Sequence, residues 1–233
     1  MTRTVEHPKL GRVTLCRRLR MRRMVLSVLR DGSVRISYPY GVAASHALDF
    51  AESRSEWIEK ARARQASRCS EVSYTDGMRT RFHTLRIVCT DAKRISVRIT
   101  DTEAIVRYPA GTEKAKIDMA AKRAYTEALR AEAAAYLPQR IETLARLHGL
   151  RYEKVRIKAL RSKWGSCTAK GDINLSLYLM TLPDPLTDFV LLHELCHTIH
   201  HNHSAQFHAL LDRLCGGREK ALSELLKKHR PPV

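Results

Sequence analysis

The chain has 233 residues, enough for one large domain or two small ones, and its 44% apolar content excludes a disordered protein. Its 42 Lys and Arg outnumber its 24 Asp and Glu, which gives a formal charge of +18. Such a surplus attracts nucleic acids, nucleotides or anionic membranes, although a basic surface that only aids solubility has the same composition.

The cysteines and the first residues bear on the cellular compartment. Six cysteines are scattered without any C-x-x-C pair, namely Cys16, Cys69, Cys89, Cys167, Cys196 and Cys215. This spacing is typical of reduced thiols in a cytosolic protein. The first residues lack the apolar core of a signal peptide, and no run approaches the ~18 apolar residues of a membrane span. We therefore expect a soluble, cytoplasmic protein.

The first elements predicted along the chain are strands. Residues 1–12 read as a loose lead-in, and β-branched and apolar residues then predict strands over 13–18, 24–30 and 34–38. Asp31-Gly32 is a hairpin turn signal between the last two. Five arginines lie at the start of this sheet, where we favour a solvated strand face over a nucleic-acid patch: Arg17, Arg18, Arg20, Arg22 and Arg23.

A helical pattern follows over residues 45–64, with Ser45 able to cap its start and Trp57 predicted in the core. Beyond it, the sequence around residues 104–111 echoes the first hairpin at an offset of 70 residues, because Tyr-Pro-x-Gly occurs in both. This echo is either a duplication or two similar hairpins. In both cases we expect an antiparallel sheet over much of residues 13–108.

The second half of the chain reads as mostly helical. Residues 113–148 form the longest helical stretch, in which Pro138 either kinks one helix or begins another, and Gly149 is a stop signal. The composition changes near Gly111. We therefore predict an α+β protein with an antiparallel β-rich domain over residues 1–112 and a catalytic domain over residues 113–233.

Within this second domain, alternation predicts a strand over residues 152–160, and a hairpin turns through residues 168–171. A helix should then follow the turn at residues 182–185, capped by Asp184 or Thr187. Another helix is expected over residues 204–214. The hairpin leads directly into the first of these helices, so its edge can form one wall of a cleft.

The helix after this turn carries the clearest chemical motif, H-E-x-x-H, at His193, Glu194 and His197. Histidines four residues apart lie on one face of a helix, where both imidazoles can bind one metal ion. The apolar residues 189–192 before them predict a buried side for this helix. The motif indicates a catalytic zinc site with Glu194 as general base, against the alternative of solvated histidines on a polar helix.

The third ligand has several candidates. We prefer His203, because Asn202 tolerates a left-handed turn that would bring the chain back towards the metal. His200 is a rival, but ligands at helical positions 0, 4 and 7 spread over ~10 Å of helix axis, too far for one zinc ion. A distant carboxylate, Glu219 or Glu224, is a further alternative.

Residues 161–167 are the second chemical candidate. Arg161 and Lys163 can bind substrate, either by stabilising an oxyanion or by holding a phosphate. The alternative is that both are exposed strand charges and that Trp164 lies in the core. Gly165 favours close packing of the hairpin against the helix. We interpret Cys167 and Cys196 as buried thiols.

The segments R-S-K-W-G-S-C, G-x-I-x-L and H-E-L-C-H-x-x-x-x-N-H-S-x-x-F, over residues 161–211, resemble the YgjP-like metallopeptidases, and the first half of the chain is similar to the family's N-terminal part. The likeness to the SprT and WLM zinc metalloproteases is more distant. The resemblance implies a zincin-like domain with His193, His197 and His203 as zinc ligands and Glu194 as base. Two positions depart from the family, Ser176 in place of Asn and His208 in place of Trp, and we expect both to line or support the cleft.

Three functions remain open at this point. The leading one is a zinc-dependent metallopeptidase. The second is a metal-dependent nucleoside triphosphate pyrophosphatase, because a member of the family is associated with hydrolysis of uridine triphosphate. The third is a nucleic-acid-binding protein with a structural zinc, which would need a fourth protein ligand. Imidazole ligands suit nickel as well as zinc, and the sequence leaves the oligomeric state open.

Overall fold

The computed structural model describes residues 2–29, 31–66 and 73–229, which leaves Arg30 and Cys69 outside the described residues. The protein has a mixed α+β fold, as predicted, and divides into two compact units, Met1–Glu71 and Val72–Val233. The boundary predicted between residues 112 and 113 lies inside the second of these units. Each unit is described by itself below.

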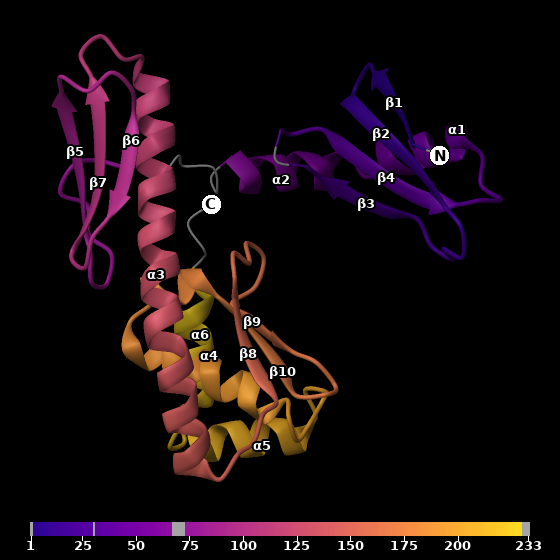
Figure 1. Ribbon diagram of the computed structural model, residues 1–233. Helices are drawn as coiled ribbons and strands as arrows, with labels where there is room; N and C mark the ends of the chain where they lie inside the picture. Colours follow the sequence, from indigo (N-terminus) through magenta and orange to yellow (C-terminus); the bar gives the residue numbers. More distant parts are fainter. Residues whose placement is uncertain (1, 30, 67–72, 230–233) are drawn as a thin grey trace. The chain divides into compact units, whose positions relative to one another are not determined.

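The first unit contains a four-stranded sheet in the order β1–β2–β4–β3 (Figure 1). Its strands are β1 (Thr2–His7), β2 (Gly11–Arg18), β3 (Val25–Val28) and β4 (Val34–Pro39). The predicted β3–β4 hairpin is confirmed, but β2 runs parallel to β4. The prediction of a loose lead-in over residues 1–12 was wrong, because β1 pairs antiparallel with β2 along its whole length.

Two helices, α1 (Ala44–Glu52) and α2 (Ser55–Ala66), replace the single helical stretch predicted here. The expected Ser45 cap is absent, since Ala43 occupies the N-cap position without a side-chain hydrogen bond. Trp57 is 44% exposed, contrary to expectation, whereas its neighbour Ile58 is fully buried in the core of this unit. Successive residues of a helix point in different directions, so only one of the two faces the sheet.

The second unit contains two three-stranded sheets. One has the order β5–β7–β6, from β5 (Thr84–Thr90), β6 (Ser96–Ile99) and β7 (Glu103–Pro109). The other has the order β8–β10–β9, from strands β8 (Lys154–Lys158), β9 (Gly165–Cys167) and β10 (Asp172–Ser176). In the first sheet the central strand β7 is parallel to β5 and antiparallel to β6. In the second sheet the central strand β10 is parallel to β8 and antiparallel to β9.

The same three-strand arrangement therefore occurs three times in the described residues, since β2, β3 and β4 pair in the same way. The echo at an offset of 70 residues marks the first two of these copies. The single antiparallel sheet expected over residues 13–108 was wrong, because these residues form two separate mixed sheets. Alternation along a strand identifies its buried face but not the direction of its partner, which depends on the crossover between strands.

The helix α3 (Lys114–His148) connects the two sheets of the second unit (Figure 1). It has 35 residues, passes through Pro138 as one helix and ends at Gly149, which has a φ of 65°. Its N-terminal half packs against β5–β7–β6 through small residues such as Ala121 and Ala128, which allow close approach. Its C-terminal half contributes larger residues, including Leu137 and Ile141, to the main core.

The remaining elements complete this main core. They are the 3₁₀ helix η1 (Leu177–Thr181) and the helices α4 (Asp184–Cys196), α5 (Ala205–Leu214) and α6 (Glu219–Lys227). The predicted helix over residues 204–214 is thus confirmed to within one residue. None of the helices in the described part of the chain is both long and apolar enough to cross a bilayer.

A buried carboxylate joins α3 to the turn before β5. Glu132 has its side chain fully buried, and its Oε1 accepts hydrogen bonds from the backbone N–H groups of Phe82 and His83 at 2.8 and 3.1 Å. The same oxygen contacts the hydroxyl of Thr80 and lies 2.8 Å from Nδ1 of His83. The other ring nitrogen of His83 donates to the carbonyl of Thr100 at 2.9 Å. One side chain thus satisfies several buried donors.

Replacing this carboxylate should destabilise the second unit. In a Trp57→Phe background Trp164 is the only tryptophan, so its fluorescence during urea unfolding follows this unit. We expect Glu132→Ala to lower the free energy of unfolding by about 3 kcal/mol, because buried N–H groups lose their acceptor. Glu127→Ala, on the same helix and half-exposed, should change it by less than about 0.5 kcal/mol. Equal effects of the two substitutions would contradict the assignment.

Candidate metal centre

The helix α4 presents the H-E-x-x-H motif because its apolar residues hold it in the core. Leu191, Leu192 and Leu195 are buried, which confirms the predicted buried side. The predicted caps are absent, since Pro183 occupies the N-cap position with no side-chain hydrogen bond. Thr187 is instead buried, and its hydroxyl lies 3.2 Å from the carbonyl oxygen of Leu179, a possible acceptor.

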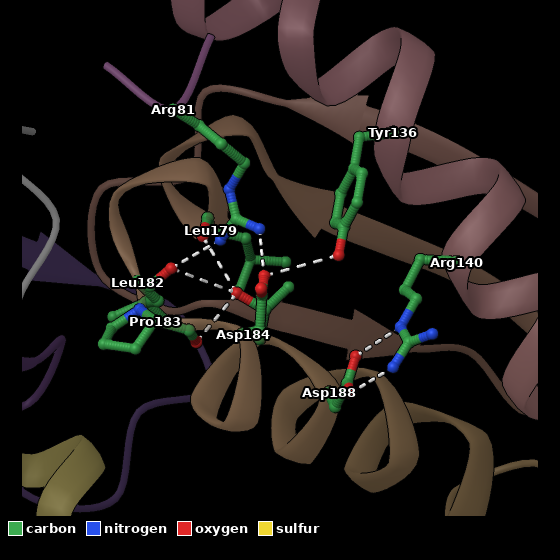
Figure 2. A network of polar contacts seen from close by, with 9 residues as sticks. Arg81, Tyr136, Arg140, Leu179, Leu182, Pro183, Asp184 and Asp188 are labelled. Carbon is green, nitrogen blue, oxygen red and sulfur yellow. Dashed lines mark hydrogen bonds and ion pairs between the residues drawn. The ribbon is translucent and has the colours of Figure 1, made fainter. Parts of the chain in front are cut away.

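Ionic and aromatic contacts attach the N-terminal half of α4 to α3 and to the segment before β5 (Figure 2). The guanidinium of Arg140 binds Asp188 in two places, at 2.7 and 2.5 Å. Arg81 contacts Asp184 and lies 4.9 Å from the ring centroid of Tyr136. Paired, planar contacts of this kind restrict rotation of the helix about its axis, which in turn sets the direction of its histidines.

The chain reverses earlier than the sequence indicated. The helix ends at Cys196, and tight turns follow, with the N–H of Ile199 donating to the Cys196 carbonyl at 3.1 Å. The predicted left-handed turn at Asn202 was wrong, because Arg20 is the one non-glycine residue with a positive φ in the described chain. Ser204 then caps α5 by accepting from the N–H of Phe207 at 3.3 Å.

Three imidazoles converge where the chain reverses. The Nε2 atom of His193 lies 3.2 Å from the Nε2 atoms of both His197 and His203. All three ligand atoms lie within 4.8 Å of one another. Zinc–nitrogen bonds of about 2.0–2.1 Å at tetrahedral angles place ligand nitrogens about 3.3 Å apart. The observed spacing therefore fits three ligands of one divalent ion.

Burial favours the neutral form of His193 and His197, and a backbone carbonyl orients the ring of His197. Burial lowers the pKa of His193 to about 4, helped by the charges of nearby histidines, and burial also lowers the pKa of His197. Nδ1 of His197 lies 3.0 Å from the carbonyl oxygen of His200, which can only accept a hydrogen. The lone pair of His197 is therefore on Nε2, on the side of the other two rings.

Phe207 packs against all three imidazole rings, and the sequence analysis did not identify it as part of the site. It is fully buried, and its ring centroid lies 5.0, 4.6 and 4.8 Å from those of His193, His197 and His203. The packing limits how far each imidazole can tilt. The available signal was its position three residues after Ser204, which places it on the first turn of α5.

Glu194 lies beside this group and approaches the β9 strand very closely. It is 5% exposed, and burial raises its pKa to about 7, with a smaller opposing effect from Lys163. Its Oε2 atom is buried without a hydrogen-bond partner among the described residues. A Cβ at Gly165 would lie 2.6 Å from its Oε1, so any larger residue there would have to displace the Glu194 side chain. The predicted close packing at Gly165 is thus present.

A cleft of about 370 Å³ opens over these residues. Its walls include all three residues of β9, together with Glu194 and the three histidines. Burial raises the pKa of Cys167 to about 11, with a contribution from Glu194, so this half-buried thiol keeps its proton at neutral pH. Cys196 is fully buried, as predicted, and burial raises its pKa to about 12.

The two predicted substrate-binding residues differ in position. Both Arg161 and Lys163 are exposed, but only Lys163 influences the pKa of Glu194. Neither lines the cleft, and no acidic partner of Arg161 occurs within the described residues. Trp164 is half-buried against the main core, which agrees with the alternative interpretation of that residue.

The rival ligands have other contacts. Glu219 lies 2.6 Å from Nδ1 of His208, and Glu224 pairs with Lys227 at 2.5 Å. His200 contributes its carbonyl to this region and is not part of the three-histidine group.

The two residues that depart from the family pattern also have defined places. Ser176 is fully buried and donates to the Leu160 carbonyl at 2.9 Å, so it supports the hairpin without lining the cleft. The ring of His208 lies 6.3 Å from that of His203, on the α5 side of the histidine group.

The model of the YgjP-like metallopeptidase domain matches residues 22–229. The chain belongs to the YgjP-like family. No curated protein matches it. Among solved structures, the metallopeptidase zymogen abylysin of Pyrococcus abyssi is 23% identical over 41% of this chain and 98% of its own, with a TM-score of 0.36. Family membership implies a divalent metal, and the three-histidine group of this YgjP-like chain could bind one.

Metal titration tests the ligand set directly. We expect one zinc ion per chain, measured by competition with a chromogenic chelator. His193→Ala, His197→Ala and His203→Ala should each weaken binding by at least about 100-fold, since loss even of supporting groups costs 10–100-fold. The control variants His200→Ala and His201→Ala should stay within about threefold of the parent. A large loss with either control, or none with His203→Ala, would contradict the ligand set.

Proposed function

We propose that this protein is a zinc-dependent metallohydrolase of the metallopeptidase type, with peptides as its substrates. The observation that carries the proposal is the convergence of three imidazole nitrogens beside a buried, unpartnered carboxylate. His193, His197 and His203 would hold the ion, and Glu194 would act as general base. A three-histidine set leaves a fourth position open, which is typical of catalytic rather than structural zinc.

The division of roles follows from the chemistry of the residues. A bound zinc ion supplies Lewis acidity, which polarises a scissile carbonyl and acidifies water. Glu194 accepts the proton of the attacking water and passes it to the departing amine. Burial raises its pKa to about 7, which suits a group that first accepts a proton and then gives it up. Gly165 leaves the space in which this carboxylate lies.

The position of β9 favours a peptide as substrate. The sheet order β8–β10–β9 leaves β9 at an edge, and its three residues line the cleft beside the histidines. An extended peptide can add to such an edge through main-chain hydrogen bonds, which holds one peptide bond near the ion. The short length of β9 limits this pairing to a few residues.

The nucleotide pyrophosphatase remains a second candidate because of Lys163. This exposed ammonium acts on Glu194 electrostatically, so it lies where it could stabilise either an oxyanion or a phosphate. Arg161 would assist it from the same segment. A hydrolysis between the α- and β-phosphates of uridine triphosphate would release pyrophosphate, which distinguishes it from peptide cleavage.

Substituting the base should separate binding from catalysis. We expect Glu194→Gln to bind zinc with unchanged stoichiometry while kcat for peptide hydrolysis falls by about 10²–10⁴-fold, because an amide cannot accept the proton. The measurement is a screen of the zinc-loaded protein against mixed peptides, with mass-spectrometric detection of products. Parallel reactions with nickel in place of zinc identify the more active metal.

The same screen includes nucleoside triphosphates with pyrophosphate detection. Pyrophosphate release that Glu194→Gln abolishes, without peptide cleavage, would replace the peptidase with the second candidate. Undiminished turnover by Glu194→Gln would refute its role for either substrate.

Gly165→Ala tests the close approach of β9 to the base. The added methyl group must displace the Glu194 carboxylate, so we expect kcat to fall by about 100-fold while zinc affinity is retained. Gly41→Ala is the matched control, because a Cβ at that glycine meets open space. Full activity of Gly165→Ala would show that the position of the carboxylate is not critical.

A further inference from the structure

The arginine cluster of the first unit lies at one edge of its sheet. Arg17 and Arg18 end β2, where they are in register with Tyr38 and Pro39 at the end of β4. Because β2 and β4 are parallel, the carboxyl ends of both strands lie at the same end of the sheet. The loop that follows β2 adds three more exposed arginines, Arg20, Arg22 and Arg23. The strand interpretation therefore holds for Arg17 and Arg18, which end β2, whereas the other three arginines lie in the loop after it.

The charges of this cluster are not neutralised within the unit. No Asp or Glu occurs in the sequence between Glu6 and Asp31, or between Asp31 and Asp49. Glu6 pairs with Arg12, and Asp31 binds Ser33 at the start of β4, which is the opposite edge of the sheet. The described residues provide no ion-pair partner for any of the four exposed arginines, Arg18, Arg20, Arg22 and Arg23.

An exposed aromatic ring lies beside these charges. Tyr40 follows β4 and is 61% exposed. The guanidinium of Arg17 lies 5.2 Å from the centroid of the Tyr40 ring and 5.7 Å from that of Tyr38. The same guanidinium contacts the Val42 carbonyl at 3.5 Å, so the stack is held in place by the backbone. A ring fixed in this way offers a flat surface to another planar group.

Local backbone strain occurs in the same loop. Arg20 has a φ of 63°, in the left-handed region that glycine or asparagine usually occupies. An arginine is strained in this region, and such outliers concentrate at binding sites. Leu19 and Arg20 are both exposed in this loop.

We propose that this surface binds single-stranded nucleic acid. Arg18, Arg20, Arg22 and Arg23 would contact successive phosphates, and Tyr40 would stack on one base. Planar guanidinium groups bind phosphate in two places, and an exposed tyrosine stacks on any base. An anionic membrane is the less suitable partner, because Leu19 is the one apolar side chain in the loop with most of its surface exposed, at 76%. The inference does not rest on the proposed hydrolysis.

Fluorescence anisotropy of the full-length protein with labelled dT₁₂ and rU₁₂ tests the proposal. Four phosphate contacts predict a slope of about −3 for log K against log salt, so binding weakens by about fifty-fold between about 50 and 200 mM salt. Glu194→Gln should bind with the parent affinity, which separates this surface from the metal centre. Failure of nucleic-acid binding would leave the proposed hydrolysis unaffected.

Two charge-matched variants locate the binding surface. The combined substitution Arg18→Gln, Arg20→Asn, Arg22→Gln and Arg23→Gln should weaken binding by about fifty-fold at low salt and flatten the salt slope. The control removes four exposed charges of the second unit that have no ion-pair partner among the described residues: Lys93→Gln, Arg94→Gln, Arg98→Gln and Arg107→Gln. It should change the affinity by less than about threefold, because these charges are not part of the proposed binding surface and exposed charges are screened by salt. Equal losses from both would show that net charge alone causes binding and would overturn the proposal.

The stacking contribution has its own test. Tyr40→Ala should weaken binding by about tenfold, whereas Tyr40→Phe should stay within about twofold, because only the ring is needed. In a Trp164→Phe background, Trp57 fluorescence during unfolding checks that the first unit stays folded in each variant. Binding to phosphatidylglycerol vesicles that the fourfold substitution abolishes, without binding to either oligonucleotide, would assign the surface to membranes and overturn the proposal.

Discussion

The candidate site depends on a single geometric constraint, which is that three imidazole nitrogens must come within about 3.3 Å of one another to share an ion. A helix can supply two of them from positions four apart, but a third on the same helix lies too far along its axis. The chain therefore has to leave the helix and return. It does so through tight turns after Cys196, and the Ser204 cap on α5 holds the returning segment. Phe207 then packs beneath all three rings and limits their movement.

The rest of the second unit holds this arrangement still. The contacts of Arg140 and Arg81 fix α4 against α3 and against the segment before β5, at the end of the helix opposite the histidines (Figure 2). At the other end, Gly165 lets β9 approach Glu194 without a clash. Burial beside this strand raises the pKa of Glu194 towards neutrality and lowers that of His193. The same desolvation thus prepares a base and a metal ligand, because it disfavours the charged form of both.

A three-strand arrangement with one parallel and one antiparallel partner recurs through the described chain, yet its copies carry different chemistry. The third copy places its edge strand over the histidines. The first copy places arginines and an exposed tyrosine, Tyr40, at the carboxyl edge of its parallel strands. The second packs against α3 through a small core of its own and contributes no histidine to the three-histidine group. A repeated scaffold therefore provides different surfaces, since residues at strand ends and in loops can vary without loss of the core.

The sequence by itself determined the local features: the helical pairing of His193 and His197 with Glu194 between them, the β3–β4 hairpin, the long helix ending at Gly149 and the family. His203, which we preferred as third ligand, does lie in the three-histidine group, although the expected left-handed turn at Asn202 does not occur. Only the tertiary structure decided the pairing direction of the strands, the place of Phe207 and the closeness of Gly165 to Glu194. These depend on contacts between residues distant in sequence, and residue patterns report burial and periodicity but not which distant segment provides the partner.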